Sequence, residues 1–203
     1  MLLNRAAALA VFASALTGPA WADEFTSAET TVALDACTQS GNVEDGARWT
    51  CPGYGGTTVL ISHFDPRFTI AFGEKAAEQR AAEQSPGAFN TLFKAESQTA
   101  TLIWRLTEMS GRSVPVAAIV RFYTEGGGST AGKTGEVLAV IKLGLANGTE
   151  ACHVARIDAL ANPDALALAE RAADNAAKFN CMSEPVIIGK TGVSPIESEG
   201  GEE

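Results

Sequence analysis

The sequence predicts an α+β fold: an antiparallel meander sheet with a C-terminal helix packed on one face, an N-terminal hairpin, a short helix and two disulfides. Three observations predict this class. Four segments in the second half alternate apolar and polar residues, which is the period of a β-strand. An apolar stripe at helical spacing follows them, and the four cysteines are even in number.

The first 22 residues have the features of a secretory signal peptide. Arg5 supplies a positive charge, residues 6–16 form an apolar run, and Ala20-Trp21-Ala22 matches a small-x-small cleavage site. The apolar run of about 11 residues is shorter than the ~20 residues of a spanning helix; the alternative is a buried N-terminal helix. We therefore expect an exported protein, periplasmic or secreted, that does not insert into a membrane.

Charge and length restrict the class of protein further. The formal net charge is −9 and no basic cluster is present, which argues against nucleic acid and anionic membranes as partners. Residues 23–190 are long enough for a single domain with a sizeable core. Residues 191–203 are acidic and rich in Ser and Gly, so we expect them to form a disordered tail.

The N-terminal half of the domain has weaker patterns. Residues 23–56 are polar and glycine-rich around the first two cysteines. Residues 57–62 and 67–72 are short apolar segments on either side of a turn containing Asp-Pro, which predicts a hairpin. Residues 73–87 predict a short polar helix that ends at Pro-Gly.

The predicted meander consists of strands at residues 101–106, 114–123, 136–143 and 151–158. Turns or short loops join them, so consecutive strands should pair antiparallel. One set of alternate positions, which includes Trp104, is almost wholly apolar and should face the core. The opposite face carries Ile103, Arg105, Ile119, Arg121, Tyr123, Val140, Lys142, His153 and Ile157.

The helix follows the last of these strands, at residues 163–179. Asn162 can cap it, Pro163 suits its first position, and Asp164 complements the helix dipole. Leu168, Ala169, Ala172, Ala173 and Ala176 form its apolar stripe.

The side of the sheet on which this helix lies depends on a turn at Asn147-Gly148. A two-residue turn pairs Leu143 with Cys152 and places Cys152 and the helix on the core face. A slip of one residue exchanges the faces of strand 151–158 and buries His153 instead. Both registers are compatible with the sequence.

Chain lengths select one of the three possible cysteine pairings. A seven-residue strand covers roughly 23 Å, and about 15 helical residues cover roughly 22 Å. A strand followed by an antiparallel helix of equal length brings Cys181 back beside Cys152, which leaves Cys37 to pair with Cys51. We therefore interpret Cys152 as structural. A catalytic Cys152–His153 pair would need a free thiolate, and a zinc site would need ligand spacing such as CxxC, which is absent.

Three segments, "LDACTQS…RWTCPGYGG", "TLIWRL" and "ACHVARIDALANPDALALAERAAD", resemble those of small exported proteobacterial proteins of unknown function. The resemblance covers most of the chain after residue 22. It implies export and disulfides, and it brings no catalytic residues with it.

Motifs for enzymatic chemistry are weak. Residues 127–134 fit the phosphate-loop pattern GxxxxGK[ST], but Gly135 and a strand-like segment follow where that loop needs a helix. This predicts a loop between two strands. Ser62 and His63 are neighbours on a strand and point to opposite faces, and no GxSxG is present. We expect no catalytic residue, metal or cofactor that the sequence can identify.

The cation-bearing face of the meander is the candidate binding surface, for an unknown protein or a small anionic ligand. The alternative is that the N-terminal half covers its apolar part and leaves the cations at the rim. The predicted function is an exported soluble binding or accessory protein, such as an inhibitor or a partner-recognition module. The alternative is a periplasmic hydrolase or isomerase with a carboxylate-based site formed only in the fold. The candidate surface comprises Arg105, Arg121, Tyr123, Lys142 and His153, with Trp49 and Tyr54 as aromatic anchors at one edge.

Overall fold

The structure is a computed structural model. It describes residues 25–42, 46–64, 67–76, 84–86, 89–94, 97–127, 131–144 and 150–196. The predicted signal peptide, the Asn147-Gly148 turn and residues 77–83 of the predicted short helix lie outside the described residues.

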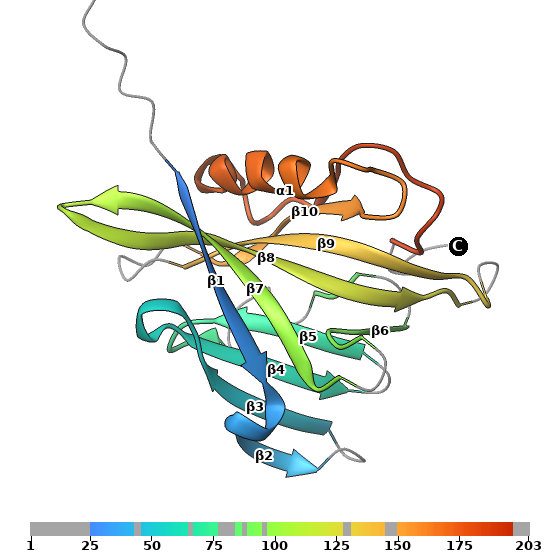
Figure 1. The fold of residues 1–203 in the computed structure, drawn as a ribbon, viewed down its shortest axis with the longest axis horizontal. Coiled ribbons are helices and arrows are strands. Elements are labelled where there is room, and N and C mark those ends of the chain that lie inside the picture. The colour runs from blue at the N-terminus through green and yellow to red at the C-terminus, as the bar shows by residue number, and fades with distance from the viewer. Residues whose placement is uncertain are drawn as a thin grey trace, which may run out of the picture.

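The fold is mostly β, so the predicted α+β class is wrong (Figure 1). Two sheets lie against each other, and the described residues contain one α-helix, on the outer face of the larger sheet. We call the two sheets the large sheet and the small sheet. The large sheet has the strand order β1-β7-β8-β9-β10-β11, with β6 pairing β8, and the small sheet has the order β2-β3-β4-β5. The large sheet comprises β1 (Thr26–Ala33), β6 (Phe89–Thr91), β7 (Thr99–Met109), β8 (Arg112–Glu125), β9 (Thr134–Lys142), β10 (Cys152–Asp158) and β11 (Val186–Ile187). The small sheet comprises β2 (Thr38–Asn42), β3 (Gly46–Pro52), β4 (Thr58–Phe64) and β5 (Arg67–Phe72).

The strands that alternate clearly in sequence are present. Strands β7 to β10 pair antiparallel in chain order, and β4 pairs with β5 as a hairpin. Residues 23–56, in contrast, contain β1, β2 and β3, which the sequence did not indicate. For β1 and β2 the reason is their exposure: β2 is exposed at every position, and β1 is buried only near its end. Strand β3 alternates between buried and exposed positions, but it lies within a glycine-rich, polar stretch of sequence. In the described ends of segment 73–87, residues 74–76 form a turn and residues 84–86 have no regular structure.

The core between the sheets is centred on Trp104, which is fully buried. Its indole packs edge-on against Phe72, with ring centroids 5.2 Å apart, and Tyr54 lies beside it at 6.4 Å. The indole N–H donates to the hydroxyl of Thr30 on β1 at 3.0 Å, which satisfies its polar atom. The apolar alternate positions of the meander therefore face the small sheet and form the main core, as expected.

Helix α1 (Ala165–Asp174) packs on the other face of the large sheet, away from Trp104. It is shorter than the predicted 163–179, and a 3₁₀ turn, Ala176–Lys178, follows it. Asn162 does not cap it with its side chain, because its amide bonds to Asp158 and Lys190 instead. Small side chains allow the helix to lie close to the sheet. The buried helical positions are Ala165, Ala169, Ala173 and Ala176.

Strand β10 contains a β-bulge. Cys152 pairs with Lys142, whereas residues 155–158 pair with β9 in a register shifted by one, which leaves Val154 without a counterpart. The two-residue turn at 147–148 predicts the register of residues 155–158, and the one-residue slip predicts that of Cys152. Both alternatives therefore occur in one strand.

The bulge decides which side chains of β10 face the helix. Cys152, Ala155 and Ile157 all lie on the helix side of the sheet, because the alternation is interrupted between the first two. His153 and Arg156 lie on the opposite side. A regular strand would turn Cys152 away from the helix whenever Ala155 and Ile157 face it.

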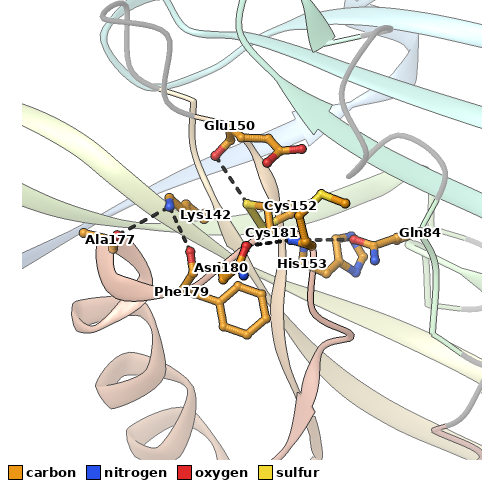
Figure 2. Close-up of a disulfide and its surroundings, with 10 residues drawn as sticks. Gln84, Lys142, Glu150, Cys152, His153, Ala177, Phe179, Asn180 and Cys181 are labelled. Atoms are coloured by element: carbon orange, nitrogen blue, oxygen red, sulfur yellow. Dashed lines mark hydrogen bonds between the residues drawn. A yellow bond between two sulfur atoms is a disulfide. The ribbon is translucent and has the colours of Figure 1, made fainter.

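Both predicted disulfides are confirmed. Cys37 and Cys51 connect the segment after β1 to β3, and Cys152 connects β10 to Cys181 beyond the helix (Figure 2). The Cα–Cα distances are 4.5 and 5.6 Å. The second bridge fixes the C-terminal end of the helical segment to the sheet.

The last described residues, 186–196, form a strap along the outer side of β10. β11 pairs parallel to β10, and Ser194 and Ile196 are buried. The expected tail therefore does not begin at Thr191, and residues 197–203 lie outside the described residues. Among the residues that the structure describes, no helix is long and apolar enough to cross a membrane.

Candidate functional site

Arg105, on β7, holds the helix to the sheet. Its guanidinium bonds both carboxylate oxygens of Asp174 at 2.8 and 3.0 Å, and it also reaches Ser27 and Glu170. The residue is 9% exposed. The bidentate pair occupies the planar fork with which arginine recognises carboxylates, so Arg105 belongs to the helix–sheet contact.

Lys142 has a similar structural role just beyond α1, at the C-terminal end of the helical segment. Its ammonium donates to the backbone carbonyls of Ala177 and Phe179, at 3.4 and 3.1 Å (Figure 2). A cation at this place satisfies carbonyls that the helical turn leaves free and complements its dipole.

His153 is fully buried and lies on the side of the sheet opposite the helix. Its backbone N–H donates to the side-chain oxygen of Gln84 at 3.0 Å (Figure 2). Its ring nitrogens have no hydrogen-bond partner within the described part of the chain. Burial, and secondarily the charge of Arg156, lower the pKa of His153 from 6.5 to about 3, so the ring is neutral near pH 7.

The two proposed aromatic anchors belong to the core between the sheets. Trp49 is 6% exposed and stacks on Phe68 at 6.3 Å, and Tyr54 lies next to Trp104. Neither extends the cation-bearing face, which is on the other side of the large sheet.

Arg121 and Tyr123 are the predicted surface residues that the helix leaves accessible. They lie on β8, on the helix side of the sheet, beyond the start of α1. Arg121 donates to the carboxylate of Glu136 on β9 at 2.5 Å, while 42% of its side chain stays exposed. Tyr123 pairs directly with Glu136 across the ladder.

Two hollows meet at Tyr123. The first, of about 450 Å³, lies over β6, β8 and β9, and we call it the acidic hollow because Glu125 and Glu136 line it. The second, of about 280 Å³, lies between β7 and β8, and we call it the basic hollow because Lys94 and Arg121 line it. Apolar side chains from the helix side border them, Leu160 at the first and Leu166 at the second.

Thr124 also lines the acidic hollow, but it is 1% exposed. Alternation along β8 turns its side chain to the face of the sheet opposite Tyr123 and Glu125, where Phe122 packs in the main core. Its hydroxyl has no hydrogen-bond partner among the described residues, and it points away from a molecule that lies over Tyr123.

The most strongly hydrogen-bonded carboxylate lies elsewhere and is structural. Asp158 is fully buried and accepts bonds from the hydroxyl and N–H of Ser194 and from the N–H groups of Leu160, Ala161 and Val193. Burial alone would raise the pKa of Asp158, but these bonds outweigh it and lower the pKa below 3.8. Asp158 thus fastens the strap to the end of β10.

Within the described residues, the groups with a shifted pKa are His153 and Asp158, and neither lines either of these two hollows. No group of three or more metal-ligating side chains occurs within the described ranges. The phosphate-loop pattern at 127–134 lies in the connection from β8 to β9, closed by a bond from Gly126 N–H to the Lys133 carbonyl, and a strand follows it.

The sequence missed most of the residues that line the hollows. Glu136 opens a predicted strand, so strand pairing places it opposite Tyr123 on the same face. Lys94 and Phe89 lie in a segment without periodicity, and no pattern indicated them. Leu160 and Leu166 are apolar side chains at the helix entry, for which the sequence suggested only packing.

Comparisons of this chain with protein-family models, with curated proteins and with solved structures find no match.

Proposed function

We propose that this is an exported binding protein whose ligand site is the pair of hollows that meet at Tyr123. The main observation in support is that the helix covers only part of one face of the large sheet and leaves two adjoining hollows, of about 450 and 280 Å³. Concave sites of this size, with apolar walls and a few placed polar groups, are typical of small-molecule sites.

Binding accounts for the described groups better than catalysis does. Catalytic acids and bases tend to have shifted pKa values and to lie in a cleft. Here the shifted groups are buried away from the hollows, and each has a structural explanation: His153 is enclosed beside Gln84, and Asp158 fastens the strap. The hollows instead offer charged side chains and apolar walls.

Export is supported by two independent features. The first 22 residues have the composition of a signal peptide. The two disulfides suit an oxidising compartment, because thiols in the cytosol are kept reduced. We therefore propose a periplasmic or secreted location.

A ligand screen by NMR tests the binding function. Isotope-labelled protein starting at Asp23 is mixed with pools of amino acids, short peptides, sugar phosphates and nucleotides at millimolar concentration. At least one pool is expected to shift the amide signals of Arg121, Tyr123 and Leu138.

A matched pair of variants locates the response. Arg121→Glu should abolish the shifts, because it reverses the charge inside the basic hollow. Arg171→Glu makes the same change on an exposed helix position that lines neither hollow, and it should preserve them. If no pool shifts these signals, or if both variants respond alike, the hollows are not a ligand site.

A further inference from the structure

The two hollows carry opposite charges. Among the residues that the structure describes, those that line the acidic hollow include two carboxylates and no lysine or arginine, and those that line the basic hollow include two cations and no carboxylate. Tyr123 lines both hollows, so one ligand that lies along β8 contacts both. Such a ligand gains favourable electrostatic interactions at both ends only if it carries a positive group at one end and a negative group at the other.

Strand geometry gives the distance between these ligand charges. Glu125 and Arg121 lie on the same strand, four residues apart, on the same face. At about 3.3 Å per residue this places their Cα atoms roughly 13 Å apart. A single amino acid is too short to reach both ends, whereas an extended chain of three or four residues has termini at a matching separation.

The groups between the two ends suit a peptide as well. Leu160 and Leu166, both more than two-fifths exposed, offer apolar contact to side chains of the ligand. A peptide supplies both apolar side chains and backbone hydrogen-bonding groups along its length.

We propose that the hollows bind a short peptide of three or four residues with free termini. Its N-terminal ammonium lies between Glu125 and Glu136, and its C-terminal carboxylate lies between Lys94 and Arg121. This inference rests on the proposed binding function and names the class of ligand. Arg121 and Glu136 form an ion pair with each other at 2.5 Å in the free protein, so these two charges lie side by side where the hollows meet. Glu125 lines the acidic hollow and Lys94 lines the basic hollow on either side of that pair.

Titrations with the tetrapeptide Ala-Leu-Ala-Ala and its capped forms test this inference. The free peptide, the N-acetylated form, the C-amidated form and the doubly capped form are titrated at low ionic strength, with amide shifts as the readout. Either cap is expected to weaken binding at least about tenfold, because it removes one charge that the site recognises.

Charge-neutral variants assign each terminus to its hollow. In Glu125→Gln/Glu136→Gln, acetylation of the peptide should no longer weaken binding, whereas amidation still should. In Lys94→Gln/Arg121→Gln the two effects should be exchanged. This pattern is a coupling between named charges and does not depend on the absolute affinity of either variant.

Three results would overturn the proposal. Capped and free peptides that bind wild-type protein equally well would show that the termini are not recognised. Absence of peptide binding, together with a response of Tyr123 to another pool, would remove the peptide as ligand and leave the binding function intact. Absence of any response would contradict both.

Discussion

His153 is an ionisable ring placed where it cannot be charged without loss of stability. Its side chain is fully enclosed, and Arg156 lies on the same side of the strand. Since the folded protein keeps the ring neutral down to about pH 3, the unfolded chain binds a proton between pH 6.5 and 3 that the native state does not. Stability therefore falls as the pH is lowered through this window.

This linkage predicts a pH-dependent difference between wild type and His153→Leu. Leucine fills a similar volume and binds no proton. At about 1.4 kcal/mol for each pH unit, wild type should lose roughly 2 to 3 kcal/mol of unfolding free energy between pH 6.5 and 4.5 that the variant keeps. Urea denaturation at a series of pH values measures the difference.

The matched control is Ile141→Leu, at the position that pairs with His153 on β9. It repacks the same place without changing a titratable group, so its stability should follow the pH dependence of wild type. Parallel curves for wild type and His153→Leu above pH 4.5 would contradict the linkage. The window lies above the ordinary pKa of Asp158, whose stabilising contribution is lost only at lower pH.

At the scale of the element, the bulge in β10 reconciles two requirements that a regular strand cannot meet together. Ala155 and Ile157 must face the helix to complete its apolar contact, and Cys152 must face it to reach Cys181. The extra residue, Val154, meets both requirements. The sequence does not indicate the bulge, because valine is an ordinary strand residue. For this reason each of the two registers predicted from the turn is correct for only one half of β10.

Deletion of Val154 should be tolerated. The shortened strand pairs regularly, with Cys152, Ala155 and Ile157 still on the helix side. The expected cost is the loss of one buried valine side chain, about 1.5 to 3 kcal/mol, with the disulfide formed. Unfolding by urea and titration of free thiols measure both properties.

Deletion of Val140, which is also buried and lies on β9, is the comparison. No bulge absorbs that deletion, so one half of β9 exchanges its faces. We expect this variant to fail to fold or to expose free thiols. Equal stability of the two deletion variants would show that the bulge does not set the facing of β10.

At the scale of the whole molecule, the strands that could be predicted are those whose sequences show apolar alternation or runs of branched residues. These features occur in the meander and in the β4–β5 hairpin. Strands β1 and β2 lack them, because they are largely exposed and lie at the edges of their sheets. Strand β3 does alternate between exposed positions and the buried Ala47, Trp49 and Cys51, but its glycine-rich, polar surroundings hid the pattern. Without them the second sheet was missing, and the turn at Asn147-Gly148 left the face on which the helix packs undecided.

The sequence also identified only part of the candidate site. Arg121 and Tyr123 line the hollows, whereas Arg105 and Lys142 have partners on the helical segment. A cation beside apolar strand residues has the same pattern in the sequence whether it binds a ligand or an element that packs later in the chain. Only the position of α1 along the sheet distinguishes these roles.

The two disulfides should stabilise different parts of the molecule. Their cysteines are 14 and 29 residues apart, so in the chain-entropy model each contributes about 3 to 4 kcal/mol. Cys152→Ala/Cys181→Ala should accelerate hydrogen exchange in α1 and leave β3 protected. Cys37→Ala/Cys51→Ala should accelerate exchange in β2 and β3 and leave α1 protected. Identical exchange patterns would mean that the two sheets open only together.

The strap has a consequence for how the molecule is completed. A chain emerges with its N-terminus first, yet β10 receives its outer neighbour from residues 186–187, which follow it in the chain and are fastened by Asp158 and Asn162. Until that stretch arrives, a row of backbone groups on β10 stands open to pairing with another chain. The strap thus covers the edge of β10 and protects it from pairing with a second molecule. A chain cut short before Val186 would keep all four cysteines but leave this edge uncovered.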